Sequence, residues 1–235
     1  MITVSIVSHG HGDMASRLVT RLQEFTEVSN VVLTCNIPET LKLRNLTQVV
    51  RINNQTPKGF GANHNAAFRH CTTNYFCVLN PDVELPCNPF QYLTTAMQSY
   101  SAEIVAPIVL APTGAIEDSV RYFPTVGALL CKMLGRGDGR YKIAPDQLPF
   151  EPDWVAGMFM LFCAKAYKQL QGFDENYFLY YEDVDICRRA RQLGLKIVCC
   201  PEVSIIHHAQ RASRNSIKHM RWHLASMYRY LRKST

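Results

Sequence analysis

The first hundred residues show two hydrophobic patterns, one typical of buried strands and one typical of helices. Continuous apolar runs predict four strands, at residues 2–7, 31–33, 49–52 and 75–79. Apolar residues at helical spacing predict two helices, at residues 14–26, with Asp13 as N-cap, and at about 62–70. Strands joined by helical crossovers predict an α/β fold: a mostly parallel sheet with helices on both faces, which binds ligands at the carboxyl ends of its strands.

The second half begins with an irregular stretch. Residues 106–153 contain many Pro and Gly and show little periodicity, and regular structure is predicted to return at Trp154. From there the pattern predicts an apolar segment, two helices, two strands and a long amphipathic helix, at residues 155–163, 164–170, 181–193, 198–200, 203–206 and 213–232. Gly194 is well placed to end the second of these helices.

The net charge of +6 is concentrated at the C-terminal end of the 235 residues. Every acidic residue lies at or before Glu202, whereas seven basic residues and no acidic one occur from Arg211 onward. We therefore expect a nearly neutral domain at residues 1–210 and a basic helical tail at 211–235. Because nucleic-acid-binding proteins carry their basic face on the folded body, this distribution argues against a nucleic-acid partner.

The tail helix has one apolar face, and the sequence leaves its partner open. The face is formed by five residues at spacings of three and four: Ile217, Met220, Leu224, Met227 and Leu231. One interpretation packs this face on the domain and leaves the basic face in water. The other lays the helix on an anionic membrane surface.

The cysteines, the first residues and the apolar runs together indicate the cellular compartment of the protein. The nine cysteines form no Cys-x-x-Cys pair and several lie inside apolar runs, which favours small buried hydrophobes in a reducing environment over a zinc site or a disulfide scaffold. The first residues lack a basic stretch and predict a core strand rather than a signal peptide. No apolar run reaches 18 residues, so no membrane span is predicted. We expect a cytoplasmic protein.

Two segments in the first half are candidates for ligand binding. Residues 59–64 nearly match a dinucleotide fingerprint, but His64 replaces its last Gly and the segment follows the third strand rather than the first. Asn63 and Asn65 can instead face a ligand phosphate at a helix start, or they can belong to a tight turn into a core helix. Asp82, after the buried strand at 75–79, can bind a hard divalent cation, or the sequence Asn-Pro-Asp can simply form a turn.

The densest chemical signal lies at residues 172–185, where five carboxylates alternate with aromatic residues. The Glu182-Asp183 pair suits a general base in a partly dry cleft, although carboxylates at a helix start also stabilise the helix dipole. Asp185 has an ordinary helical pairing with Arg188 and Arg189. His207, at the end of the strand at 203–206, is either structural or the completion of a metal shell.

These segments together resemble the family 2 inverting glycosyltransferases, and within them the rhamnosyltransferase-like branch. The resemblance is carried by residues 4–9, 59–65, 80–84, 172–175, 178–185 and His207. It implies a GT-A fold, with a nucleotide-sugar half at about 1–105 and an acceptor half at about 106–210.

The resemblance also implies individual roles. Ser8 and His9 would lie near the nucleobase, and Gly61, Asn65, Asn80 and Asp82 are expected to contribute to the nucleotide-sugar site. Asp82 and His207 would hold Mg²⁺ or Mn²⁺, and Asp183, beside Glu182, would deprotonate the acceptor hydroxyl. Two departures bear on the donor: Asn80 replaces the first Asp of the usual Asp-x-Asp motif, and residues 31–36 lack an acidic residue.

The implied function is transfer of a sugar, with L-rhamnose as one candidate, from a nucleotide-sugar such as dTDP-rhamnose to a glycan or a polyprenyl-diphosphate-linked saccharide. Such a reaction belongs to bacterial surface polysaccharide synthesis and would take place in the cytoplasm or on the inner face of the cell membrane. One alternative is a sugar-1-phosphate nucleotidyltransferase, although residues 8–12 lack the cationic loop that it needs. Another is a non-catalytic carbohydrate-binding module.

Overall fold

The computed structural model describes residues 1–43, 47–133, 135–137, 139–144, 146–208 and 217–233. Its strands are β1 (Ile2–Ser8), β2 (Val28–Cys35), β3 (Val49–Asn53), β4 (Tyr75–Leu79), β5 (Val83–Glu84), β6 (Ile104–Leu110), β7 (Val120–Arg121), β8 (Trp154–Val155), β9 (Phe159–Cys163) and β10 (Ile197–His207). Its helices are α1 (Asp13–Leu22), α2 (Phe60–Phe68), α3 (Phe90–Ser99), α4 (Val126–Met133), α5 (Ala164–Gln169), α6 (Glu182–Gln192) and α7 (Ile217–Lys233).

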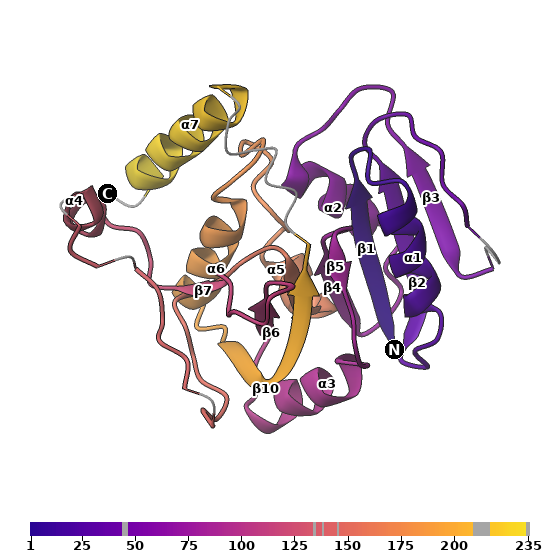
Figure 1. Ribbon diagram of the computed structural model, residues 1–235, viewed down its shortest axis with the longest axis horizontal. Helices are drawn as coiled ribbons and strands as arrows, with labels where there is room; N and C mark the ends of the chain where they lie inside the picture. The colour runs from indigo at the N-terminus through magenta and orange to yellow at the C-terminus, as the bar shows by residue number, and fades with distance from the viewer. Residues whose placement is uncertain (44–46, 134, 138, 145, 209–216, 234–235) are drawn as a thin grey trace.

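One large sheet runs through the centre of the molecule, with the strand order β3-β2-β1-β4-β9-β6-β10-β5 (Figure 1). Strands β3, β2, β1 and β4 are parallel to one another, as are β6 and β10. Strand β9 is antiparallel to both of its neighbours, β4 and β6, and therefore joins the two parallel groups. The mostly parallel α/β sheet predicted from the sequence is confirmed.

Helices cover both faces of this sheet because successive side chains of a strand point to opposite sides. On β4, Leu79 packs in a cluster with residues of α1 and α3. Its neighbour Val78 packs in a second cluster with residues of α2, α5 and α6. The strands are apolar on both faces, which is the pattern of a sheet buried between two layers of helices.

Several elements differ from the sequence prediction. Helices α3 and α4 and strands β5, β6 and β7 were not predicted, and the two strands expected at 198–200 and 203–206 form one strand, β10. The pairing of β10 with β6 shifts between Cys200 and Ser204, on either side of Pro201. Because proline has no N–H to donate, it interrupts the ladder without ending the strand.

The packing face of α7 also differs from the expectation. Ile217, Met220 and Leu224 were assigned to a face that packs on the domain or on a membrane, and in the structure they are 74%, 58% and 51% exposed. The interpretation that this face packs on the domain therefore fails for these three residues, whereas Met227 and Leu231 are half-buried and Leu231 packs on the domain. The helix instead buries Ser226 and Tyr230, the latter in a cluster with residues of the segment leading into α6. Residues 213–216 of the predicted helix lie outside the described residues.

Within the described ranges, no helix combines the length and the apolar character needed to cross a bilayer.

Candidate active site

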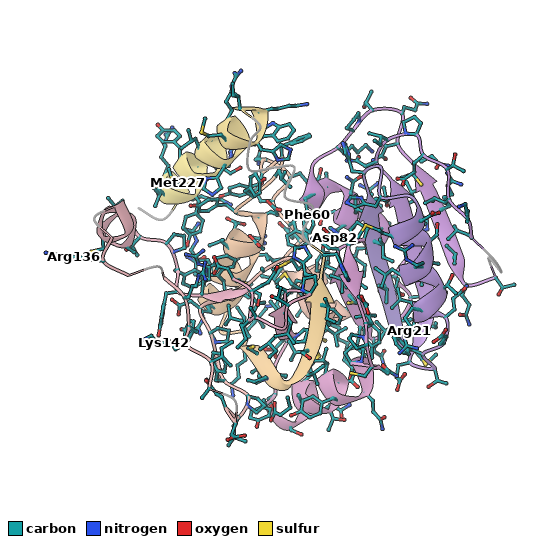
Figure 2. The ribbon with its side chains drawn as sticks, in the orientation of Figure 1. Arg21, Phe60, Asp82, Arg136, Lys142 and Met227 are labelled. Carbon is teal, nitrogen blue, oxygen red and sulfur yellow. The ribbon has the colours of Figure 1, made fainter. Side chains whose placement is uncertain are left out.

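A cavity of about 530 Å³ opens at the carboxyl ends of β1, β2 and β4, and we call it the donor cavity because the family resemblance implies a nucleotide-sugar site at residues of its wall. Figure 2 labels two residues of its wall, Phe60 at the start of α2 and Asp82 after β4. The wall also includes residues of the loop after β1, of the segment before α6 and of α7. Its residues are Val7, His9, His11, Asn36, Pro57, Lys58, Phe60, Asn63, Asn80, Pro81, Asp82, Phe178, Leu179, Lys218, His219 and Trp222.

Asp82 offers a buried carboxylate to this cavity. The turn that carries it is fixed by Asn80, whose backbone N–H donates to the Met158 carbonyl at 3.0 Å. The Asp82 residue is 9% exposed, and its Oδ1 atom has no hydrogen-bond partner among the residues that the structure describes. Its Oδ2 atom lies 3.3 Å from Nε2 of His207. A buried carboxylate oxygen without a partner is costly, so Oδ1 is available for a ligand.

His207, the last residue of β10, links Asp82 to a second carboxylate. Its Nδ1 atom lies 2.7 Å from Oε2 of Glu117. Burial acts to lower the pKa of His207, but hydrogen bonds and negative charge from Asp82 and Glu117 raise it above its usual value. A histidine oriented by a carboxylate on its far nitrogen is the usual arrangement behind a metal ligand. Sequence reasoning did not identify Glu117, which lies in the irregular segment.

Asp82 and His207 fit a divalent cation that is shared with a ligand. Within the described part of the chain, no group of three or more His, Cys, Asp or Glu side chains has the arrangement of a metal site. Mg²⁺ and ions like it are often held by one or two protein side chains together with phosphate oxygens of the substrate. The unpartnered Asp82 Oδ1 and the nearby His207 Nε2 are suitable donors of that kind.

The loop after β1 is held by Glu39, a residue that sequence reasoning missed. The Ser8 hydroxyl donates to Glu39 Oε2 at 2.8 Å, and the Gly12 N–H donates to the same oxygen at 2.9 Å. Ser8 is fully buried by this contact, whereas His9 is exposed and lines the donor cavity. The acidic residue expected near the end of the second strand is absent from 31–36, but Glu39 follows four residues after β2 ends at Cys35.

Gly61 and Asn65 were expected to bind the nucleotide-sugar, and the structure gives both of them packing roles instead. A Cβ at Gly61 would lie 2.6 Å from Cβ of Phe173, so only glycine allows this approach. Asn65 Oδ1 accepts hydrogen bonds from the Tyr167 hydroxyl and the Phe173 N–H, at 2.8 and 2.9 Å. Asn65 Nδ2 donates to the Phe173 carbonyl and to Glu175. Both residues fix α2 against the 172–175 turn, and neither lines the donor cavity.

A second cavity, of about 260 Å³, lies at the start of α6, and we call it the acceptor cavity. Two consecutive residues, Tyr180 and Tyr181, lead into the helix with φ of 70° and 68°. Non-glycine residues rarely adopt this left-handed conformation, which the surrounding contacts must stabilise. The cavity is lined by Arg121, Tyr122, Phe123, Pro124, Ala128, Gly139, Trp154, Tyr180, Tyr181, Glu182, Asp183, Val184 and His223.

Glu182 and Asp183 lie together in the wall of the acceptor cavity. The Asp183 carboxylate accepts hydrogen bonds from the Gly157 N–H at 3.1 Å and from the Val184 N–H at 2.9 Å. Burial raises the pKa of Asp183, against the lowering effect of these N–H groups. Burial, with the charge of Asp183 beside it, raises the pKa of Glu182 well above its usual value. A fixed carboxylate with a raised pKa, beside a cavity, has the properties of a general base.

Asp185 belongs to the structural framework of α6, as its helical spacing predicted. It is fully buried, and its carboxylate binds Arg189 Nε at 2.7 Å and Lys233 Nζ at 2.9 Å. Lys233 also binds Asp174 at 2.8 Å. This network ties the end of α7 to α6 and to the turn at 172–175, so it holds the helix that carries Glu182 and Asp183.

The fold defines the structural class: it is the GT-A fold. The chain is similar to the solved structure of GalNAc-T7 with UDP, GalNAc and Mn²⁺ (TM-score 0.67, 14% identity, 89% of this chain and 43% of that one). It is also similar to the mannosyltransferase PcManGT from Pyrobaculum calidifontis in complex with GDP-Man and Mn²⁺ (TM-score 0.60, 12% identity, 97% of this chain and 64% of that one).

The sequence gives the family. The model of "Glycosyltransferase like family 2" matches residues 24–225, so this chain belongs to glycosyltransferase family 2. It is 29% identical to rhamnosyltransferase WbbL of Escherichia coli K12 over 98% of this chain and 92% of that relative. It is 28% identical to N-acetylglucosaminyl-diphospho-decaprenol L-rhamnosyltransferase of Mycobacterium tuberculosis H37Rv over 67% of this chain and 55% of that relative. The resemblance to the rhamnosyltransferase-like branch is confirmed.

Proposed function

We propose that this chain transfers a sugar from a nucleotide-activated donor to an acceptor hydroxyl, with inversion at the sugar C1. The observation that carries the proposal is the close approach of the two cavities. Gly157 lies between Phe60, in the donor cavity, and Asp183, in the acceptor cavity: a Cβ built on it would lie 3.1 Å from the Phe60 ring and 3.7 Å from Asp183 Cβ. A base on one side and a diphosphate site on the other suit a single displacement.

In this reaction the Asp183 carboxylate takes the proton of the acceptor hydroxyl. The hydroxyl oxygen forms a bond to C1 of the donor sugar as the bond from C1 to the diphosphate oxygen breaks, and the diphosphate leaves with the bonding electrons. The Gly157 and Val184 N–H groups hold the carboxylate toward the cavity. A positioned base of this kind supplies about 10²–10⁴-fold in rate.

Asp82 and His207 would hold a Mg²⁺ or Mn²⁺ ion at the donor diphosphate. Such an ion neutralises the negative charge that develops on the leaving group. The unpartnered Oδ1 of Asp82 and the Glu117-oriented His207 support this assignment, as do the Mn²⁺ ions named in two of the similar solved structures. Ser8, through Glu39, and His9 would shape the part of the cavity that receives the nucleobase.

The relatives suggest the substrates. Two of them are named as rhamnosyltransferases, one acting on N-acetylglucosaminyl-diphospho-decaprenol. We therefore propose dTDP-L-rhamnose as the donor and a polyprenyl-diphosphate-linked saccharide as the acceptor, in the synthesis of a bacterial surface polysaccharide.

The test is to mix the purified protein with Mn²⁺, a short-chain polyprenyl-diphosphate-linked N-acetylglucosamine and a panel of nucleotide-sugars that includes dTDP-L-rhamnose and several UDP-sugars. We expect acceptor-dependent release of a nucleoside diphosphate and a product whose C1 configuration, seen by NMR, is opposite to that of the donor. Retention of configuration would refute the single displacement. A protein that binds these donors without turnover would instead be a carbohydrate-binding module.

The exposed stripe of α7 supports a place at the inner face of the cell membrane. Ile217, Met220 and Leu224 face solvent, and Arg221 lies beside them on a helix that has no acidic residue. An apolar stripe with basic flanks suits an anionic bilayer, on which each basic residue contributes about 1 kcal/mol. We expect co-sedimentation with phosphatidylglycerol vesicles that weakens in high salt and in Met220→Glu. Equal binding to neutral vesicles, or none, would contradict this location.

A further inference from the structure

Helix α7 packs along the segment that leads into the Glu182-Asp183 pair. The Trp222 and Phe178 rings lie 4.7 Å apart, centroid to centroid. The Tyr180 hydroxyl lies 2.9 Å from His219 Nδ1, and the Ser226 hydroxyl donates to a carbonyl of the same segment. At its other end the helix is held by the Lys233 ion pairs to Asp174 and Asp185. Its inner face therefore has a defined position over the site.

This inner face contributes side chains to both cavities. Lys218, His219 and Trp222 line the donor cavity, and His223 lines the acceptor cavity. Figure 1 shows α7 at the upper left of the molecule, above α6. The sequence predicted a basic tail outside the catalytic domain, and it gave no sign that one of the tail's lysines lies beside a ligand cavity.

Lys218 is held by an aromatic ring rather than by an acid. Its Nζ atom lies 4.8 Å from the centroid of the Trp222 ring, a cation–π contact that orients the ammonium group and leaves its charge uncompensated. Among the ion pairs found in the described residues, Lys218 takes part in none. Trp222 in turn is positioned by Phe178 and by His219, whose rings lie 4.7 and 5.0 Å away.

The rest of the donor cavity is also suited to an anion. Its wall contains the cation Lys58, the imidazoles of His9 and His11, and the carboxylate of Asp82 at which a divalent cation can bind. Lys218 adds a further positive charge. It is carried by α7, which is far along the sequence from Lys58 and covers the cavity. A diphosphate, with several oxygens spread over its length, can contact a cation at Asp82 and an ammonium group on α7 together.

We propose that Lys218 is a donor-binding residue, whose ammonium group contacts the diphosphate of the nucleotide-sugar and of the nucleoside diphosphate product. Trp222 and Phe178 hold that ammonium group in place. This inference rests on the proposed function, since it takes the donor cavity as the nucleotide-sugar site. The terminal helix thus closes the donor cavity and supplies one of its positive charges.

The experiment measures the binding of UDP and of dTDP by calorimetry, with Mn²⁺ and without lipid, to the wild type and three variants. Lys218→Met removes the charge and keeps the length of the side chain, and Lys218→Arg keeps the charge. Arg221→Met is the matched control, because it removes one charge from an exposed position of the same helix that lines neither cavity. The melting temperature of each unliganded variant confirms that it is folded.

We expect Lys218→Met to weaken binding of the nucleotide that the wild type binds by about 10- to 100-fold, the effect of losing one hydrogen bond to a charged group. It should also reduce the dependence of the affinity on salt. Lys218→Arg should recover most of the affinity, and Arg221→Met should stay within about twofold of the wild type. Wild-type affinity and salt dependence in Lys218→Met would overturn the inference. Failure of the wild type to bind either nucleotide would overturn the proposed function beneath it.

Discussion

Asn65→Ala distinguishes a packing role from a ligand-binding role at the start of α2. In the structure the Asn65 amide makes four hydrogen bonds, and two of them satisfy donors that are otherwise buried. These donors are the hydroxyl of Tyr167, which is 1% exposed, and the N–H of Phe173. Alanine can accept neither hydrogen bond, so both donors lose their partner inside the core.

The magnitude follows from these two donors. A buried donor left without a partner costs about 1–3 kcal/mol, so two such donors cost about 2–6 kcal/mol. Because the structure can relax into the space that the amide leaves, we expect a loss of about 3 kcal/mol in the free energy of unfolding. For a chain of this size, each kcal/mol lowers the melting temperature by roughly 2–4 °C. Asn65→Ala should therefore melt roughly 6–12 °C below the wild type.

The assay combines thermal unfolding with nucleotide binding. Asn65→Asp is the informative partner variant, because it keeps the accepting oxygen Oδ1 but places a second oxygen where Nδ2 donated to the Phe173 carbonyl and to Glu175. It should also be destabilised, since this oxygen faces two acceptors. Below the melting transition, both variants should bind UDP or dTDP with the affinity of the wild type. A normal melting temperature together with weakened nucleotide binding would show that Asn65 is a ligand and that the packing argument is wrong.

Three further predictions concern the two cavities. Asp183→Asn should lower kcat about 10²–10⁴-fold, measured by release of nucleoside diphosphate, with little change in the donor KM; in the wild type, activity should rise with pH through the raised pKa of this base. Asp82→Ala should weaken Mn²⁺-dependent nucleotide binding in calorimetry, and His207→Ala should act in the same direction but less strongly. Glu182→Gln should gain stability relative to the wild type in urea unfolding as pH increases above about 4.5, because the folded wild type keeps a proton there that the unfolded chain releases.

Each of these predictions has a contrary result. Turnover of Asp183→Asn within tenfold of the wild type would move the base to another carboxylate. Equal Mn²⁺-dependent affinity in Asp82→Ala and the wild type would leave Asp82 as a turn residue. A stability difference between Glu182→Gln and the wild type that does not change with pH would mean that burial does not perturb the ionisation of Glu182.

Strands β1, β2 and β4 of the first half were predictable because their residues are buried on both faces. A strand buried on both faces reads as a continuous apolar run, so the sequence predicted β1 and β4 nearly at their observed bounds. The direction of β9 was not predictable, since Phe159–Cys163 has the same apolar pattern as a parallel strand. Its orientation is set by its position between β4 and β6, which is a tertiary property.

The candidate site likewise contains residues that the sequence revealed and residues that only the structure revealed. Asp82 and His207 lie at strand ends and Asp183 near the start of a helix, as the sequence predicted, while their roles came from the family resemblance. Glu39 and Glu117 lie in segments without periodicity, and only the folded chain brings them to Ser8 and His207. The packing face of α7 was misjudged because aliphatic side chains were weighed above aromatic ones, while the real contacts are made by rings such as Trp222.

The central position of β9 has a consequence for the order in which the protein can be assembled during its synthesis. After Leu79 leaves the ribosome, the outer edge of β4 has no partner until Phe159–Cys163 is available, about 80 residues later. At typical elongation rates this takes roughly 4–16 s. During that time the nascent first half of the chain carries an open, strongly apolar strand edge, which is a site for association with other chains. This half is therefore not a separable folding unit, and expressed alone, as residues 1–105, it should aggregate.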